Sequence, residues 1–428
     1  MADTIPAPRR LALCLSATLL ASCGPAPAPV TLNYPHGWSY LPDELARRAA
    51  LSQQFARETG IHVRDIPTPE STFDQLALYR KLLWQGSSGA DLLGIDLIWS
   101  DLLAPDLIDL QPYLADDISS VQPQMLPSYT VAGKVVAVPY QVNIGALEYR
   151  PDLLREYGFD HPPETWDELE SMAKRIQTGE RAKGRKDFWG FVWQGAQAEA
   201  LTCNGLEWQA AEGGGRIVED DRTISVNNPA TIRAWQRARH WIGWISPPGV
   251  VAYRERDSIN LFDSGGAAFD RVWLGTSVAR SGPSSQFYWR NLEPRMKTGF
   301  ASLPRGPGGS AGTLGGSGLA VSRRSAHPQE AIKLVHFLMH AQLEAIERRK
   351  NGADQPEFGN AAQNVTVVHR PSIETGSLYS QVSAAYVDAL HAVLTGQKGA
   401  PVAAAELEKK LIEITGFRKG PPKIRNSL

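Results

Sequence analysis

Cysteine is scarce in this sequence, with three among 428 residues. They are Cys14, Cys23 and Cys203. We expect Cys14 to be lost with an N-terminal targeting segment and Cys23 to be chemically modified, so one thiol is left for the folded part. This excludes a disulfide within the mature chain, and stability therefore has to come from a hydrophobic core.

An excess of either charge is also missing. The sequence has 44 lysines and arginines against 45 aspartates and glutamates, a net charge of −1 with histidine neutral. Proteins that bind nucleic acid through its phosphates usually carry a clear basic excess. The near balance therefore argues against a nucleic-acid partner. The sequence also contains no internal repeat.

No apolar run is long enough to cross a bilayer, which takes about 20 residues. The apolar residues 11–20 follow Arg9-Arg10, an arrangement typical of a secretory signal peptide. Leu20-Ala21-Ser22-Cys23 comes next and has the form of a lipobox. The alternative is an ordinary signal peptide with a chance cysteine.

From this motif we predict a lipoprotein signal peptide over residues 1–22, with lipid on the Cys23 thiol. Residues 23–29 would then hold the modified cysteine and a stiff spacer rich in proline and alanine. The mature protein would be anchored to a membrane at the periplasm or cell surface.

Short strands and helices alternate from residue 30 onward. The pattern predicts strands at 30–34, 61–66 and 96–99, with helices at 42–59 and 70–85 between them. Such alternation is typical of an α/β fold with a largely parallel sheet and helices on both faces. In sheets of this kind ligands gather at the carboxyl ends of the strands.

The segment from residue 134 to 175 shows how the chain would cross between two units. Apolar runs at 135–138 and 145–149 predict two strands, joined by the polar linker Gln141-Val142-Asn143. Downstream, Thr165-Trp166-Asp167-Glu168 has the pattern of a capping box. There the threonine oxygen accepts from the N–H of Glu168, and the glutamate reaches back to the N–H of Thr165.

The second half contains five further predicted helices, a short one among them at residues 257–262. One begins at Asn228-Pro229, with Trp235 on its inner face, and a long one begins at Pro328. Two more cover residues 379–395 and 402–414. The last residues, 418–428, are basic and proline-containing, and we expect them to be disordered.

Several stretches together resemble the periplasmic binding proteins of sugar-importing ABC transporters, extracellular solute-binding protein family 1. The most specific are "RPDLLREYGF" at 150–159 and "PPETW" at 162–166. Residues 91–114, 201–218, 265–273, 312–321 and 370–382 fit the same family. The resemblance covers about residues 30–417, and it is greatest to the trehalose- and maltose-binding branch.

The resemblance implies the two-lobe periplasmic-binding-protein fold of type II, in which two α/β lobes are joined by a hinge. The first lobe would comprise residues 30–140 and 300–351. The second would comprise residues 141–299 and 352–417. The hinge would lie near Tyr140 to Asn143, and the ligand would bind in the cleft between the lobes.

The resemblance also implies roles for cleft residues. Asp96 would accept hydrogen bonds from sugar hydroxyls, and Trp273 would offer a ring face to a pyranose. Gly315 and Gly316 would let the backbone approach the ligand, and Arg370 would donate to it. The remaining expected cleft residues are Tyr140 and Asn143.

Three departures from the family pattern put the identity of the sugar in doubt. The family often has aspartate at the position of Asn143 and tryptophan at the position of Ser317. It often has Arg-Asn-Trp where this chain has Arg271-Val272-Trp273. By itself, each marked residue also has an ordinary structural interpretation, because most tryptophans are buried in cores and paired glycines form turns.

The resemblance implies a monomeric receptor that passes a neutral sugar, such as trehalose or maltose, to an ABC permease. Such a receptor needs no catalytic residue, cofactor or metal. A binding protein for a polyol or a peptide is the first alternative. A glycoside hydrolase is the second, because paired carboxylates in a sugar cleft look the same from sequence.

Two short patterns suggest other chemistry. Gly308-Gly309-Ser310-Ala311-Gly312 matches G-x-S-x-G, but a nucleophile elbow needs a strand before it and a helix after it, and here prolines precede it and a strand-like piece follows. His336 and His340 are four residues apart on a predicted helix. They lack a neighbouring glutamate or third ligand in the sequence, so we expect a surface or packing role.

The lipobox generates the first prediction. Replacement of Cys23 by alanine should leave the precursor uncleaved or release the protein from the membrane fraction, because the acceptor thiol for the lipid is gone. Fractionation and an immunoblot of precursor and mature forms measure this. Normal processing and normal membrane retention of the variant would show that the lipobox interpretation is wrong.

Overall fold

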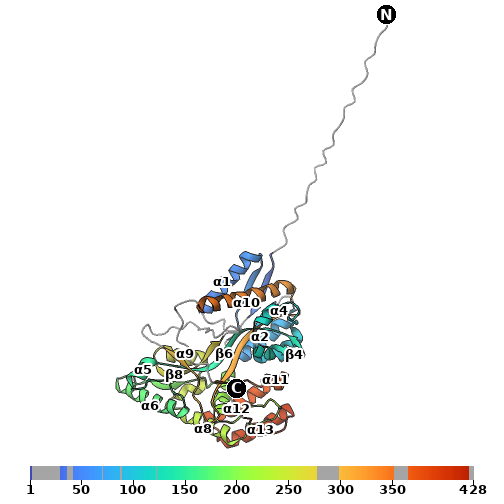
Figure 1. Ribbon diagram of the computed structural model, residues 1–428. Coiled ribbons are helices and arrows are strands. Elements are labelled where there is room, and N and C mark those ends of the chain that lie inside the picture. The colour runs from blue at the N-terminus through green and yellow to red at the C-terminus, as the bar shows by residue number, and fades with distance from the viewer. Residues whose placement is uncertain are drawn as a thin grey trace.

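The structure is a computed structural model, and it describes residues 1, 29–35, 42–69, 71–86, 89–121, 123–276, 298–350 and 365–423. Residues 2–22 of the predicted signal peptide and Cys23 lie outside these residues. Figure 1 shows two lobes, with α1 and α10 (Pro328–Lys350) in one and α6, α8, α12 and α13 in the other. In the described part of the chain, no helix is both long and apolar enough to cross a membrane.

The first lobe begins with the alternating elements that the sequence predicts. They are β1 (Thr31–Pro35), α1 (Pro42–Thr59), β2 (His62–Ile66), α2 (Thr72–Trp84) and β3 (Leu92–Asp96). β1 and β2 pair in parallel, as expected. The predicted strand at 96–99 is wrong in position, because β3 ends at Asp96 and residues Leu97–Trp99 form a 3-10 turn.

Short elements continue the first lobe before the chain crosses over. They are α3 (Ser100–Leu103), a 3-10 turn at Ala104–Asp106, α4 (Ala115–Ser120), a 3-10 helix at Pro123–Tyr129, β4 (Thr130–Val131) and β5 (Lys134–Val135). Side chains from β1, α2, β3 and α10 pack into one hydrophobic core here, among them Leu32, Tyr79, Ile95 and Val335. Burial of this apolar surface is what stabilises the lobe.

The second lobe has its own core. Its elements are α5 (Pro151–Glu156), α6 (Trp166–Ala182), β7 (Trp189–Val192), α7 (Glu199–Ala211), α8 (Pro229–Trp241), a 3-10 turn at Pro248–Ala252, α9 (Glu255–Asp263), β8 (Ala267–Thr276), β9 (Gly299–Ala301), α12 (Tyr379–Leu394) and α13 (Ala400–Thr415). The expected burial of Trp235, Trp241 and Trp244 is confirmed for the first two, which are fully buried, whereas Trp244 follows the end of α8 and is only partly buried. Trp241 also packs edge-on against Trp208.

Two helix starts show how the local sequence specifies these elements. The Thr165 hydroxyl accepts from the N–H of Glu168 at 3.2 Å, as the capping box predicts. The returning carboxylate of Glu168 accepts from Glu164 N at 2.8 Å instead of from Thr165 N. The Asn228 side chain accepts from the N–H groups of Ala230 and Thr231 and so caps α8.

Two strands of 12 residues each, β6 (Val138–Tyr149) and β10 (Ser310–Val321), join the lobes. They pair with each other antiparallel, while β3 pairs with β10 and both β8 and β9 pair with β6, all antiparallel. β11 (Val365–Val368) and β7 complete the sheet with parallel pairings. The expected largely parallel sheet is therefore wrong for the centre of the molecule.

The polar linker predicted at 141–143 is likewise part of a strand. Gln141, Val142 and Asn143 lie within β6 and pair with Ser317, Gly316 and Gly315 of β10. Hydrogen bonding to the neighbouring strand satisfies backbone groups that the linker interpretation left to solvent. This part of β6 is polar because Gln141 and Asn143 line a cleft between the lobes.

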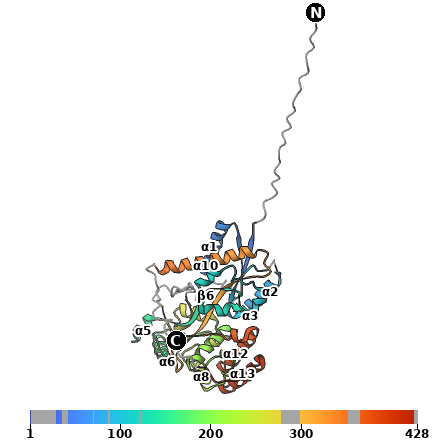
Figure 2. The same cartoon turned by 45° about the vertical axis from the view of Figure 1, so that its right-hand side comes forward.

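The two cores meet along β10. Ala311 packs in the core of the second lobe, whereas Leu314 packs in that of the first. Leu303 still belongs to the second core. The chain therefore passes to the first core later than residue 300, where the sequence analysis put the boundary. In both views of the fold, β6 runs between the lobes (Figures 1 and 2).

The C-terminal segment is ordered as far as the described residues go, which corrects the expectation of disorder. Lys419 forms a parallel bridge with Ile224, and Gly420 N donates to Ile224 O at 2.9 Å. Lys423 Nζ lies 2.7 Å from Asp221 Oδ2. Residues 424–428 lie outside the described part.

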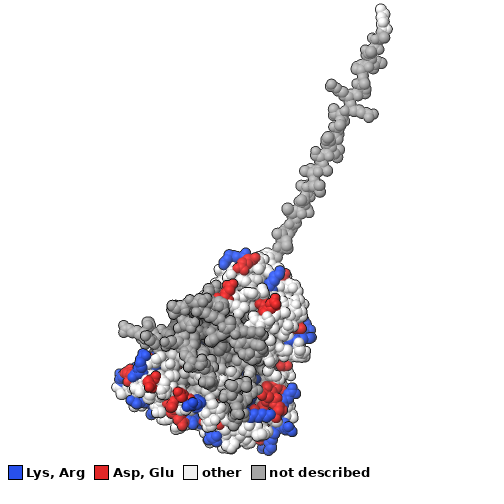
Figure 3. Space-filling model, in the orientation of Figure 1, with Lys and Arg blue, Asp and Glu red and all other residues white. Residues whose placement is uncertain are grey.

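Charges of both signs are interspersed on the visible face of the molecule (Figure 3). This agrees with the balanced composition. A surface of mixed charge lacks the strong single-sign field that steers polyanions.

Candidate functional site

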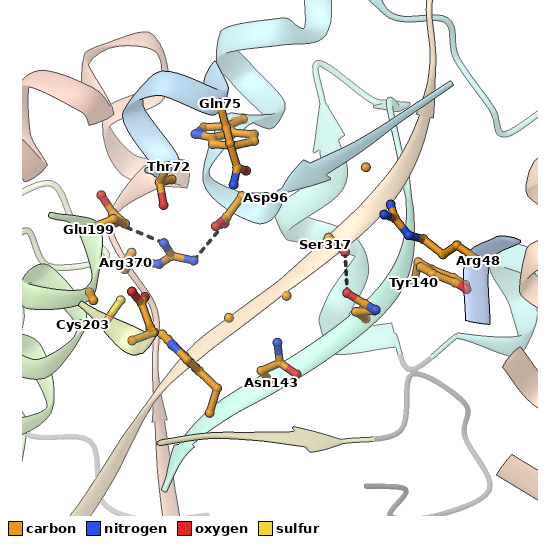
Figure 4. Close-up of a pocket in the computed structure, with 18 of the residues that line it drawn as sticks. Arg48, Thr72, Gln75, Asp96, Tyr140, Asn143, Glu199, Cys203, Ser317 and Arg370 are labelled. Atoms are coloured by element: carbon orange, nitrogen blue, oxygen red, sulfur yellow. Dashed lines mark hydrogen bonds and ion pairs between the residues drawn. The ribbon is translucent and has the colours of Figure 1, made fainter. Parts of the chain in front are cut away.

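A cleft lies between the two lobes and takes side chains from both (Figure 4). Its empty volume is about 1020 Å³, open solvent included. All seven residues that the sequence analysis assigned to a ligand site line it: Asp96, Tyr140, Asn143, Trp273, Gly315, Gly316 and Arg370. Segments more than 270 residues apart in sequence are thus brought together, as the 274-residue separation of Asp96 and Arg370 shows.

Asp96 occupies the carboxyl end of β3, where its side chain is 25% exposed. Its Oδ1 accepts from Ile98 N at 3.2 Å, which caps the following 3-10 turn, and from Arg370 Nη2 at 2.9 Å. Among the described residues, Oδ2 has no hydrogen-bond partner. The carboxylate is therefore held in place through one oxygen, and the other keeps its lone pairs for a donor in the cleft.

Arg370 is almost fully buried and joins the lobes. Its Nη2 donates to Asp96 of the first lobe, and its Nη1 donates to Glu199 of the second at 3.1 Å. Both contacts are drawn in Figure 4. The nearby carboxylates, chiefly Asp96, outweigh burial and raise the pKa of Arg370 well above its usual value. Nη1 and Nη2 of Arg370 thus already donate to carboxylates, and donation from Arg370 to a ligand stays a prediction.

Glu199, the first residue of α7, is a cleft residue that the sequence analysis missed. It is buried, and it accepts from Arg370, from the Tyr379 hydroxyl and from Ser383 Oγ at 2.7 Å. Burial raises the pKa of this carboxyl, while Arg370 opposes the shift. No local pattern marked Glu199, because its partners come from segments more than 170 residues away.

Trp273 is half-buried on β8, and an arginine lies against it. The Arg271 guanidinium carbon is 4.0 Å from the centre of the indole ring, a cation–π arrangement. Arg271 is in turn held by Glu207 of α7, through Nε to Oε2 at 3.0 Å and Nη2 to Oε1. Arg271 therefore holds one face of the indole ring in place, and the exposed part of the ring borders the cleft.

Contacts within the protein give a reason for glycine at positions 315 and 316 besides the expected approach of a ligand. A Cβ at Gly315 would lie 2.8 Å from Trp273 Cζ3, and one at Gly316 would lie 2.1 Å from the carbonyl oxygen of Gln141. Gly316 also has φ = +138°, which side chains rarely tolerate. Protein atoms fill the space that a side chain would need, so these glycines allow β10 to approach β6 and Trp273.

The polar side chains of β6 form one wall of the cleft. Gln141 Oε1 accepts from Ser317 Oγ at 3.3 Å, and the Tyr140 hydroxyl accepts from Arg47 at 3.5 Å. Asn143 is buried and lines the same wall. Two of the three departures from the family pattern, Asn143 and Ser317, therefore border the space where a ligand would lie.

The G-x-S-x-G pattern does not form a nucleophile elbow. Ser310 begins β10, so a strand follows it where an elbow needs a helix. Its hydroxyl donates to Leu303 O at 2.6 Å. The serine therefore has a structural role at the start of β10.

Comparison with known families agrees with this geometry. A sequence profile described as "Bacterial extracellular solute-binding protein" matches residues 38–342, well over half of the chain. The chain belongs to this family of solute-binding proteins. It is accordingly a binding protein and not an enzyme, and the family implies a periplasmic or cell-surface location.

Relatives of this solute-binding protein support the assignment. A Deinococcus radiodurans protein named "Probable ABC transporter-binding protein" is 37% identical over 380 residues, which cover 85% of this chain and 89% of the relative. A maltose-bound structure of T. maritima MalE3 is 31% identical with a TM-score of 0.77 and covers 90% of this chain and 100% of its own.

A more distant structure shares the fold alone. A solute-binding protein from Agrobacterium vitis S4, solved with bound D-mannitol, is 17% identical with a TM-score of 0.68. The match covers 91% of this chain and 100% of that one. The expected two-lobe α/β fold is thus confirmed across nearly the whole chain.

The support beneath Trp273 generates a stability prediction. Both members of the Arg271–Glu207 pair are buried, with side chains 1% and 0% exposed. Arg271→Met should lower the free energy of unfolding by about 3–5 kcal/mol, because it leaves the Glu207 charge without its partner. Urea unfolding measures the loss.

The double variant Arg271→Met/Glu207→Gln should be more stable than the single variant, because no uncompensated charge remains. Arg181→Met is the matched control, since Arg181 also stacks on a tryptophan, Trp189, at 4.4 Å without a buried carboxylate partner in the described contacts. Equal stability of the single and double variants would contradict the prediction.

Proposed function

We propose that this solute-binding protein captures an uncharged sugar in the interlobe cleft and delivers it to the permease of an ABC importer. An α-linked disaccharide of glucose, such as trehalose or maltose, is the first candidate ligand. The observation that carries the proposal is a cleft that combines a supported indole with a carboxylate while its total charge is balanced.

The charge balance separates a neutral ligand from an anionic one. The cleft is lined by three acidic residues, Asp96, Glu199 and Glu255, and by three basic residues, Arg47, Arg48 and Arg370. Arg370 is committed to Asp96 and Glu199, and Arg48 lies 3.6 Å from Asp65. A phosphate or dicarboxylate would need uncompensated basic groups, and this lining is poor in them.

The indole and the carboxylate suit the two kinds of surface that a sugar has. The C–H face of a pyranose packs on an aromatic ring, and its equatorial hydroxyls point outward to polar groups. Trp273 supplies the ring, held by Arg271. Asp96 Oδ2 supplies a charged acceptor, which forms stronger hydrogen bonds than a neutral one.

The comparisons favour a sugar without naming which one. The T. maritima protein at 31% identity was solved with maltose, and a more distant protein of the same fold was solved with D-mannitol, a polyol. Asn143 and Ser317, where this chain departs from the family pattern, border the cleft. Sugar specificity would therefore differ from that of other family members through these two positions. A polyol ligand is therefore the second candidate.

The remaining parts of the proposal concern organisation. The receptor would act as a monomer, tethered by lipid on Cys23 and with a hinge near Tyr140 to Asn143. The lobe assignment, 30–140 with 300–351 against 141–299 with 352–417, is supported by the two separate cores, with the passage to the first core shifted to β10.

Removal of the ring tests the ligand site. Trp273→Ala should weaken disaccharide binding by roughly 1–3 kcal/mol, because the sugar face loses its apolar contact. Isothermal calorimetry against trehalose, maltose and mannitol measures the change. Trp84→Ala is the control, since Trp84 is 82% exposed and lies outside the cleft lining.

Asp96→Asn tests the acceptor with the same calorimetry. The expected loss is roughly 1–3 kcal/mol, because a charged acceptor for the sugar hydroxyls becomes neutral. Two results would contradict the proposal in different ways. Wild-type protein that binds no neutral sugar but binds an anion or peptide would overturn the function. Sugar binding equal in wild type and both variants would overturn the site alone.

Ligand should also draw the lobes together, because the cleft takes contacts from both and β6 and β10 connect them. Small-angle scattering should give a smaller radius of gyration with saturating sugar than without it. Trp273→Ala at the same sugar concentration is the control, and its radius should change less. An unchanged radius for saturated wild type would count against closure.

A further inference from the structure

Two histidines and an aspartate meet on the first lobe, away from the cleft. His336 and His340 are one helical turn apart on α10, and Asp117 comes from α4. One potential ligand atom from each residue lies within 4.8 Å of the other two. The sequence shows no third ligand near the histidines because Asp117 is 219 residues from His336, and the fold brings the three residues together.

The two sides of helix α10 face different environments. Leu338 lines the sugar cleft, whereas His336 and His340 have side chains that are 55% and 57% exposed. Two residues along a helix correspond to a rotation of about 200°, so the histidines lie on the side of α10 that faces away from Leu338. The cluster is therefore independent of the proposed sugar site.

Asp117 directs a buried carboxylate at both histidines. Its side chain is 2% exposed, and its Oδ2 lies 2.8 Å from His336 Nδ1. Its Oδ1 lies 3.7 Å from His340 Nε2, too far for a hydrogen bond, and is buried without a hydrogen-bond partner among the described residues. A buried carboxylate oxygen without a partner is costly, so a cation at this point would be stabilising.

We propose that His336, His340 and Asp117 bind a divalent transition-metal ion, Zn²⁺ first, and leave a fourth position to water. Imidazole nitrogen and carboxylate oxygen are zinc ligands at about 2.0–2.2 Å. Tetrahedral geometry then requires ligand atoms about 3.3 Å apart. The two printed distances belong to different oxygens of Asp117, 2.8 Å from Oδ2 to His336 Nδ1 and 3.7 Å from Oδ1 to His340 Nε2, so the side chains would rotate on binding to bring one oxygen near both nitrogens.

The ligand set distinguishes among metals. Mg²⁺ and Ca²⁺ bind mainly oxygen, and one carboxylate with two imidazoles does not provide the six or more oxygens they prefer. Imidazole suits Zn²⁺, Ni²⁺, Cu²⁺ and related ions. Glu58, Glu344 and Lys333 line the surface hollow that holds the two histidines. Two of these residues are acidic and one is basic, which favours binding of a cation.

A simple His–Asp hydrogen bond accounts for less of the geometry. That bond needs one histidine, yet the His340 ring lies 4.2 Å from the His336 ring, centre to centre, and faces the second carboxylate oxygen. A bound ion would contact both imidazole rings and would also give the unpartnered Oδ1 of Asp117 a positive charge nearby. It would also tie α4 to α10 across the first lobe, since each helix supplies part of the ligand set.

Zinc titration of untagged, metal-stripped protein tests the proposal. Calorimetry should give one equivalent of Zn²⁺ per chain, and the melting temperature should rise with zinc because the ion binds the native state. His336→Ala and His340→Ala should each weaken zinc binding by at least about tenfold. Co²⁺ should give visible absorption bands typical of four-coordinate geometry, lost in both variants.

His161→Ala is the matched control, because His161 is an exposed histidine outside the cluster, with Nε2 3.6 Å from Asp160 Oδ1. It should bind zinc as the wild type does. Unchanged sugar binding by the two α10 variants reports that they are folded. Absence of saturable zinc binding in the wild type, or wild-type zinc affinity in either α10 variant, would overturn the proposal.

Discussion

The antiparallel pairing of β6 with β10 is the constraint on which the rest of the structure depends. The two strands share a register from Leu314–Ile144 to Leu319–Val138, with one irregularity between Ser317 and Gly318. They pass between two hydrophobic cores, so the polar residues at their middle border a cleft instead of a core. Glycine is required at 315 and 316 because the partner strand and Trp273 occupy the space of a side chain.

Buried charges in and under the cleft lie in contact with opposite charges. Arg370 bridges Asp96 and Glu199 across the lobes, and Arg271 neutralises Glu207 beneath Trp273. Buried charges have to be paired in this way because desolvation would otherwise be too costly. The consequence is a polar site with little net charge, which accords with a neutral ligand and with membership of a solute-binding family.

Helix α10 connects two chemically different surfaces of the first lobe. Its inner side packs in the core and reaches the cleft through Leu338, and Gln342 donates to the Tyr140 carbonyl of β6 at 3.1 Å. Its outer side carries the two histidines that face Asp117. Because β6 contains the proposed hinge, an ion that tied α4 to α10 would stiffen the lobe on one side of the moving part.

The sequence by itself determined much of the local structure and the class of the protein. Helix and strand periodicity located α1, α2, α12 and α13 to within about two residues, because burial on one face dictates the spacing of apolar residues. The family motifs located the cleft residues. Tertiary structure decided what those residues do: Arg370 pairs with carboxylates, the glycines make room for protein atoms, and Glu199 and Asp117 join sites that no local pattern marked. The physical reason is that hydrogen bonds and ion pairs between segments hundreds of residues apart depend on the folded geometry. Periodicity within one segment does not predict which distant residues will meet it.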